Sequence, residues 1–168
     1  MKRLKTLLFA FALIFGMSFM SAQSKVAHIN TQELVEAMPS MQSAKAELEK
    51  LAKTYETEIQ NMATELQNKV KQYDAEASTK TDEENTTRMQ EVQTMEQSIR
   101  QYQAQAQQDL AGKEAALLEP ILKKAKDAVV KVAQAQGFDY VLDSTAGQGV
   151  ILADGKDLLA DVKKELGF

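Results

Sequence analysis

The stretch YETEIQNMATELQNKVKQY (residues 55–73) decides the fold, because its pattern is helical throughout while its apolar stripe is thin. It contains neither Gly nor Pro, and good helix formers dominate it. Large apolar residues recur every three or four positions, at Tyr55, Ile59, Met62, Leu66, Val70 and Tyr73. So narrow a stripe is typical of a coiled-coil seam rather than of a helix buried in a globular core.

The stripe extends in both directions and predicts one long helix from about Ser40 to about Ala77. Its steps alternate 3, 4, 4, which is an 11-residue repeat rather than a heptad, so a nearly straight or slightly right-handed coil is expected. The seam residues are Leu48, Leu51, Tyr55, Ile59, Met62, Leu66, Val70, Tyr73 and Ala77.

A second long helix is predicted from about Asp82 to about Ala135, after the break STKT at 78–81. Thr81 and Glu84 have the spacing of a capping box at its start. A short turn between two long helices predicts an antiparallel hairpin, with residue i near residue 160 − i and arms of about 55 Å. The second stripe comprises Met89, Val92, Met95 or Glu96, Ile99, Tyr102, Ala106 and Leu110.

Both ends of the chain predict small α/β elements. VAHIN (26–30) is strand-like, and Asn30 with Glu33 has capping-box spacing ahead of a short helix that Pro39 interrupts. Beyond Pro120 the apolar face of the second helix widens, and Gly137 is a suitable residue to end it. The remaining elements are strands at 138–143 and 150–153 around a turn at 146–149, then a helix capped by Asp157.

These elements predict a mainly α fold with a small β body, from which a long antiparallel coiled-coil hairpin projects. Residues 25–44 and 119–168 form the body, residues 45–118 form the arm, and the turn lies near 78–81. Short strands leave pairing edges, so the body is expected to serve oligomerisation. The expected oligomer interface comprises Val26, Ile29, Val141, Leu142, Val150 and Ile151, and the expected hinge comprises Gly112 and Pro120.

The N-terminal residues 1–24 have the pattern of a secretory signal peptide. Lys2, Arg3 and Lys5 precede the apolar run 7–20, and small residues follow, so cleavage is expected after Ala22 or after Ser24. The alternative is an uncleaved anchor, but the run is short for a spanning helix. We therefore expect an exported protein whose membrane contact is at most peripheral.

Composition excludes several kinds of partner. Residues 1–24 hold three of the 20 Lys and Arg and none of the 24 Asp and Glu, so the remainder carries a net charge of −7. Nucleic acid and anionic lipid are poor partners for such a chain. The chain has no Cys, so stability must come from packing or oligomerisation rather than from disulfides.

No constellation of residues points to catalysis, so no enzyme activity, cofactor or metal is expected. His28 is the single His and is interpreted as structural. Asp154 and Asp157 in DGKD lack the alternating oxygen ligands of a calcium loop.

Two features of the arms leave alternatives open. Met62, Leu66, Met89 and Met95 are candidate client-binding residues, either as a soft surface for apolar clients or simply as seam packing. The Gln-rich segment QSIRQYQAQAQQ (97–108) is interpreted as a solvated helix face rather than as a prion-like tract.

The two ends of the chain resemble the Skp (OmpH-like) periplasmic chaperone family. The similarity lies in KVAHINTQEL followed by Pro39, in PILKKAKDAVVKVAQAQGFDYVLD (120–143), and in VILAD and DLLADV (150–154 and 157–162). It covers the whole mature chain in layout and is specific in the C-terminal part.

This resemblance implies a homotrimer that holds unfolded outer-membrane β-barrel precursors between helical arms, without ATP. Well-known family members are basic, whereas this chain is acidic, so capture here would use apolar arm surfaces or local patches such as Lys123, Lys124 and Lys126. The alternative hypothesis is a structural coiled-coil spacer or adaptor of the cell envelope.

Overall fold

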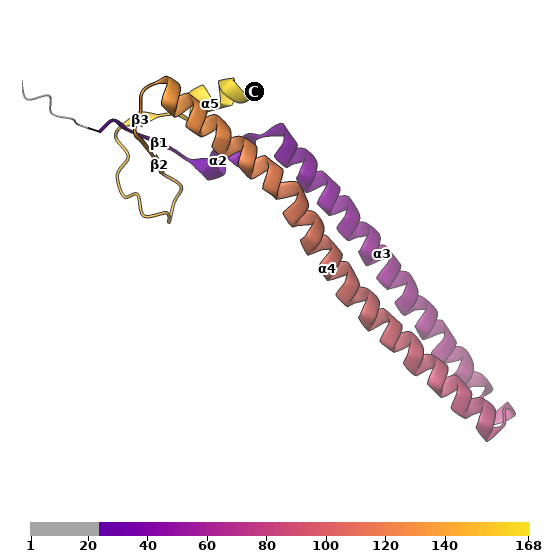
Figure 1. Cartoon of the computed structure of the whole chain (residues 1–168). Coiled ribbons are helices and arrows are strands. Elements are labelled where there is room, and N and C mark those ends of the chain that lie inside the picture. Colours follow the sequence, from indigo (N-terminus) through magenta and orange to yellow (C-terminus); the bar gives the residue numbers. More distant parts are fainter. Residues whose placement is uncertain (1–23) are drawn as a thin grey trace, which may run out of the picture.

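The computed structural model describes residues 24–168, in which two long helices dominate (Figure 1). The predicted signal peptide, apart from Ser24, lies outside the described residues. In chain order the elements are β1 (Val26–Ile29), α2 (Thr31–Ala37), α3 (Pro39–Glu76), the 3-10 turn η1 (Ala77–Thr79), α4 (Asp82–Ala135), β2 (Tyr140–Asp143), β3 (Lys156–Asp157) and α5 (Leu159–Leu166).

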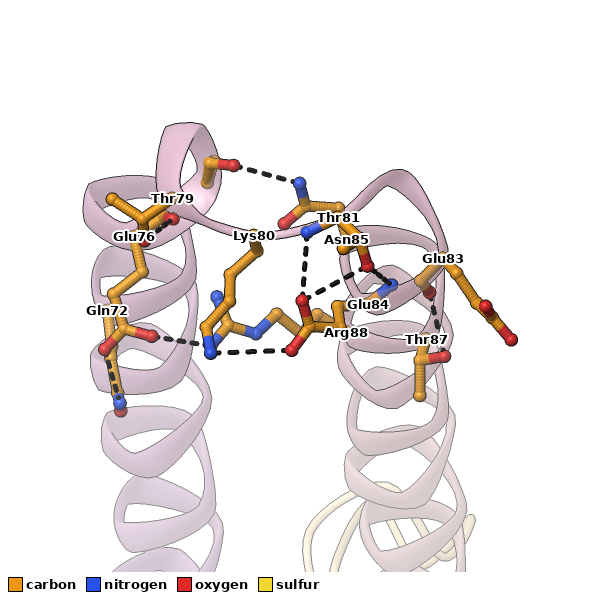
Figure 2. Close-up of polar contacts among 11 residues, drawn as sticks. Gln72, Glu76, Thr79, Lys80, Thr81, Glu83, Glu84, Asn85, Thr87 and Arg88 are labelled. Atoms are coloured by element: carbon orange, nitrogen blue, oxygen red, sulfur yellow. Dashed lines mark hydrogen bonds and ion pairs between the residues drawn. The ribbon is translucent and has the colours of Figure 1, made fainter.

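Helices α3 and α4 form the predicted antiparallel hairpin, which projects from a small body that contains the strands, α2 and α5 (Figure 1). The hairpin turns at η1, and α4 begins with the predicted capping box. Thr81 Oγ1 accepts a hydrogen bond from Glu84 N at 3.2 Å, and a Glu84 carboxylate oxygen accepts from Thr81 N at 2.9 Å (Figure 2). The capping box therefore pairs the backbone N–H groups of Thr81 and Glu84 at the start of α4, which opposes fraying there.

Contacts across the hairpin confirm the predicted register. Lys113 Nζ lies 2.7 Å from a Glu47 carboxylate oxygen, and these residue numbers sum to 160. The rings of Tyr55 and Tyr102 meet edge to face with their centroids 5.9 Å apart. The short turn sets this register because it fixes where each residue of α4 returns along α3.

The seam holds the arms together without forming a core. From Leu48 to Tyr73 every predicted seam residue of α3 is half-buried, whereas Ala77 is exposed. The residues of the second stripe, on α4, are also half-buried, except that Ala106 is buried and Met89 is exposed. A two-helix ribbon can bury only one stripe per helix, so the arms keep two long solvent-facing sides. The handedness of the coil stays a prediction.

The hydrophobic core lies in the body. Beyond Pro120 the wider apolar face of α4 contributes Ile121, Ala125, Ala128 and Val132 to it, as predicted. The same core cluster includes Ala27 and Ile29 of β1 and Val162 of α5, so elements from both ends of the chain pack with α4. The largest fully buried side chains are Ile29, Leu34, Met38, Leu158 and Val162.

The sheet corrects one prediction. Its order is β2-β1-β3 with both pairings parallel, from Val26 opposite Tyr140 to Ile29 opposite Asp143. The strand predicted at 150–153 is absent, and residues 156 and 157 form β3 instead. Long-range pairing decides this, because β1 takes β2 and β3 as its two neighbours and residues 150–153 are left in the loop that joins β2 to β3.

Helix α4 is continuous through Pro120, so the helix predicted from about Asp82 to about Ala135 is confirmed. Pro120 is exposed, while Leu117 and Ile121 on either side pack against the core. That packing keeps the helix continuous despite the lost backbone hydrogen bond.

The other predicted helix ends are mostly confirmed. Gly137 has a positive φ of 74° just after α4. Asn30 Oδ1 accepts from Glu33 N at 3.0 Å, but the Glu33 carboxylate pairs with Lys163 of α5 rather than closing the box. Asp157 Oδ1 accepts from Leu159 N at 2.9 Å, although the N-cap position itself is Leu158.

Candidate functional site

The two sides of the hairpin arm carry different chemistry. Successive helix residues lie about 100° apart, so residues just before and just after each seam residue fall on opposite sides of the ribbon. Lys69 precedes the seam residue Val70, whereas Gln60 follows the seam residue Ile59. We call the side of Lys69 the clamped face and the side of Gln60 the open face.

The clamped face carries the polar contacts that join the two helices. Tyr55 Oη donates to Asp109 Oδ2 at 3.0 Å, and Lys69 and Tyr73 both bind the Glu91 carboxylate. Near the turn, Arg88 Nη2 lies 2.5 Å from a Glu76 carboxylate oxygen. The pair of Glu47 with Lys113 belongs to the same set. Six charged residues of these contacts directly precede a seam or stripe residue and therefore lie on the clamped face: Glu47, Lys69, Glu76, Arg88, Glu91 and Asp109.

The ionisation of the clamped face favours these contacts at neutral pH. Hydrogen bonds from Lys69 and then Tyr73 lower the pKa of Glu91. Hydrogen bonds from Gln72 and Arg88 lower the pKa of Glu76. Both carboxylates are therefore held in the charged form that their partners require.

A groove of about 420 Å³ on the clamped face contains two of the predicted client-binding residues. Met62 and Met95 line it together with Ile99, and Glu65, Lys69 and Glu91 add charge to it. Leu66 is half-buried in the seam, and Met89 lies apart with 56% of its surface exposed. The structure therefore does not bring the four residues together.

A second groove, of about 730 Å³, lies on the open face nearer the body. Its floor is Tyr55, Ile59, Ala106 and Leu110, which belong to the seam. Its walls are small or uncharged except for Glu56, and they comprise Ala52, Glu56, Gln60, Ala63, Gln103 and Gln107.

The body exposes apolar side chains on the outer side of its sheet. Val26, Tyr140 and Leu142 alternate with inward-facing residues and are 44%, 60% and 46% exposed. In the following loop Ile151 and Leu152 are 101% and 82% exposed. Of the other predicted interface residues, Val141 and Val150 are half-buried and Ile29 lies in the core.

Sequence reasoning missed a groove of about 610 Å³ in the body. It lies between α2, α4 and the sheet, with Val35, Met41, Val129 and Val141 among its apolar residues. The widened apolar face of α4 was the one sequence feature that pointed to this groove. The sequence could not show that α2 covers that face only in part.

The remaining predicted residues have structural surroundings. The imidazole of His28 lies within hydrogen-bond distance of Ser144 Oγ and Gly155 O, at 3.3 and 3.2 Å, which fits a structural role. Lys123, Lys124 and Lys126 are exposed, and Lys123 pairs with Asp127.

Over residues 24–168 no three His, Asp or Glu side chains gather as metal ligands would. Nor does any helix in this range combine the length and apolarity that a membrane span requires.

The predicted hinge residues Gly112 and Pro120 both lie within continuous α4 and are exposed. Gly112 has nothing within 4 Å of the position a Cβ would occupy, so packing does not require a glycine there.

Comparison with known proteins gives consistent matches over nearly the whole chain. A family model described as outer membrane protein (OmpH-like) matches residues 25–166. The chain is 28% identical over 158 residues to chaperone protein Skp of Photorhabdus luminescens, covering 94% of each chain. It is 27% identical over 145 residues to chaperone protein Skp of Pectobacterium atrosepticum, covering 86% of this chain and 87% of that one.

A solved structure shares the fold. A putative outer membrane chaperone (OmpH-like) from Caulobacter crescentus CB15 superposes with a TM-score of 0.78. The match covers 86% of this chain and 85% of the other at 20% identity, so it supports the architecture of hairpin and body.

Proposed function

The chain belongs to the OmpH-like outer membrane protein family, and we propose that it is an ATP-independent periplasmic chaperone that holds unfolded outer-membrane proteins. The observation that carries this proposal is the arm itself. Helix α3 is 38 residues long and packs on α4 through a half-buried seam, which leaves two grooved sides free for contact. A chaperone that encloses a chain without folding it needs such a surface, and it needs no catalytic group.

We propose that three copies assemble through the body, with residues 25–44 and 119–168 as the oligomerisation unit and 45–118 as the arm. Apolar groups at Val26, Tyr140, Leu142, Ile151 and Leu152 are exposed in one chain and would be covered in the oligomer. The free outer edges of β2 and β3 offer additional pairing sites. Residues 150–153, strand-like in sequence, could pair there with a neighbouring copy.

Export follows from the predicted signal peptide, with cleavage after Ala22 or Ser24. The mature chain would then carry a net charge of −7, so attraction to anionic lipid is weak and membrane contact is at most peripheral. Clients are therefore expected to be held by apolar and hydrogen-bonding contacts rather than by a basic surface.

The test is light scattering during dilution of a urea-unfolded outer-membrane β-barrel protein into buffer containing the chain from residue 25. We expect suppression of aggregation that saturates at about three chains per client, because one trimer would enclose one substrate.

The competing hypothesis, a structural spacer of the cell envelope, predicts no suppression at any ratio. A sample shown by circular dichroism to be helical, and by sedimentation to be oligomeric, makes such a negative result decisive.

A further inference from the structure

The carboxamides that line the open-face groove differ from that of Gln105 in their hydrogen bonding. Gln105 lies towards the clamped face and donates to Asp109 Oδ1 at 2.7 Å. Gln103 and Gln107 lie two positions to either side and line the open-face groove instead. Within residues 24–168 neither their carboxamides nor that of Gln60 makes a hydrogen bond to the protein, so all three are available to a ligand.

We propose that the open-face groove is the part of the arm that receives the client, as an extended segment of unfolded polypeptide bound through its main chain. This inference rests on the proposed chaperone function and adds to it the face and the chemistry of contact. The Gln-rich segment 97–108, interpreted from sequence as a solvated face, thereby acquires a role.

The chemistry of the groove suits a main chain of any sequence. A carboxamide both donates and accepts hydrogen bonds, as a peptide N–H and C=O require. Ala52 and Ala63 are small enough for a backbone to approach, and Tyr55, Ile59 and Leu110 offer apolar contact below. Only Glu56 brings charge to the groove, so binding there discriminates little by the charge of the client.

The dimensions are also suitable. On α3 the groove runs from Ala52 to Ala63, which is about 16 Å at 1.5 Å per residue. An extended chain advances about 3.3 Å per residue, so about five client residues would lie along it. Its volume of about 730 Å³ exceeds the 420 Å³ of the groove on the clamped face.

The clamped face is the poorer alternative because its charges are already used. A peptide entering its groove would contact Lys69 and Glu91, which pair with each other across the arm. Desolvating or separating that pair would oppose binding and would loosen the arm as well.

The experiment exploits the absence of Cys from the chain. Single cysteines are introduced at exposed positions, Ala63→Cys and Gln103→Cys on the open face and Thr94→Cys and Ser98→Cys on the clamped face, and each is labelled with a benzophenone maleimide. The probe is a urea-unfolded outer-membrane β-barrel protein, and each labelled variant is first checked for suppression of its aggregation. We expect photocrosslinking to the client to be several-fold stronger from the open face.

A second comparison tests binding rather than proximity. Gln103→Glu/Gln107→Glu adds two negative charges to the open face, and Thr94→Glu/Ser98→Glu adds the same charge to the clamped face. We expect the first double variant alone to need several-fold more chain for half-maximal suppression, with unchanged helicity in both.

The outcomes separate the two proposals. Full suppression with equal or stronger crosslinking from Thr94 and Ser98 would overturn the face assignment and leave the chaperone function standing. Crosslinks from Ala63 and Gln103 chiefly to a second copy of the chain would also overturn it, because the groove would then be a contact between arms. An unsubstituted chain without suppression would overturn both proposals.

Discussion

At the residue scale, Asp143 joins the end of β2 to the start of α2. Its carboxylate accepts hydrogen bonds from Thr31 Oγ1 at 2.5 Å and from Thr145 N at 2.9 Å. Partial burial raises the pKa of Asp143, but the hydrogen bonds from Thr145 and Thr31 together lower it to about 2. The charged carboxylate is therefore the form that stabilises the body.

This shift predicts a pH dependence. Because the folded pKa lies below the unfolded value of 3.8, the stabilisation is present above about pH 4 and is lost as the pH falls towards about 2. Asp143→Asn should lower the urea midpoint at pH 7 and flatten the decline between pH 4 and pH 2. Asp154→Asn, at an exposed loop position, is the control and should keep the original profile.

At the tip of the arm, Arg88 joins the two helices, as Asp143 joins β2 to α2 in the body. Its guanidinium lies 4.6 Å from the centroid of the Tyr73 ring, and its side chain is only 17% exposed. It also pairs with Glu76 (Figure 2). Buried Nη1 has no hydrogen-bond partner among the described residues. Beyond Tyr73 the seam ends, and this cluster takes its place.

Arg88→Ala should therefore loosen the tip, lowering the free energy of local opening by about 1–2 kcal/mol through loss of the cation–π contact and the charged hydrogen bond. Faster amide hydrogen exchange in residues 72–92 is the expected observation. Arg100→Ala is the control, because the Arg100 side chain is 64% exposed and lies 3.8 Å from Glu96 on the same helix. Equal effects from the two substitutions would contradict a locking role for Arg88.

At the scale of the element, α4 runs for 54 residues through Gly112 and Pro120, two residue types that disfavour a helix interior. It tolerates Pro120 because packing on both sides holds it, and it tolerates Gly112 at the cost of backbone entropy. The proposed hinge can be tested at Gly112, where a methyl group meets no neighbour within 4 Å.

Gly112→Ala should stabilise the chain by about 0.5–1 kcal/mol, since alanine is the better helix former and the space is free. Gly137→Ala should do the opposite, because Gly137 has a positive φ of 74° that alanine adopts only with strain. Urea unfolding measures both changes. A hinge at Gly112 further predicts slower client capture by the stabilised variant, and unchanged capture would argue against it.

At the scale of the whole molecule, exposed apolar groups gather on the body while the arms expose few. Ile151→Asp tests whether this surface is the oligomer interface. Ile151 is fully exposed, so the substitution should leave the folded chain intact, yet burying a carboxylate between copies should abolish the trimer. Molar mass from sedimentation should fall to that of one chain. Met89→Asp, at an exposed arm position, is the control, and a retained trimer in Ile151→Asp would move the interface elsewhere.

The sequence by itself determined the long helices, their register and the helix ends. These features rest on local interactions: the seam spacing, the capping box at Thr81 and Glu84, and the glycine after α4 are all read within a few residues. The short turn then fixed which residues face each other, as Glu47 and Lys113 confirm.

Only the tertiary structure decided the sheet and the two faces of the arm. Strand pairing joins residues more than a hundred positions apart, so local pattern favoured a strand at 150–153 while the edges of β1 were filled by β2 and β3. The clamped and open faces likewise depend on which polar groups meet across the hairpin. Spacing along one helix defines two sides, but the physical difference between them arises only when Lys69 meets Glu91 and the carboxamides of Gln103 and Gln107 meet no partner.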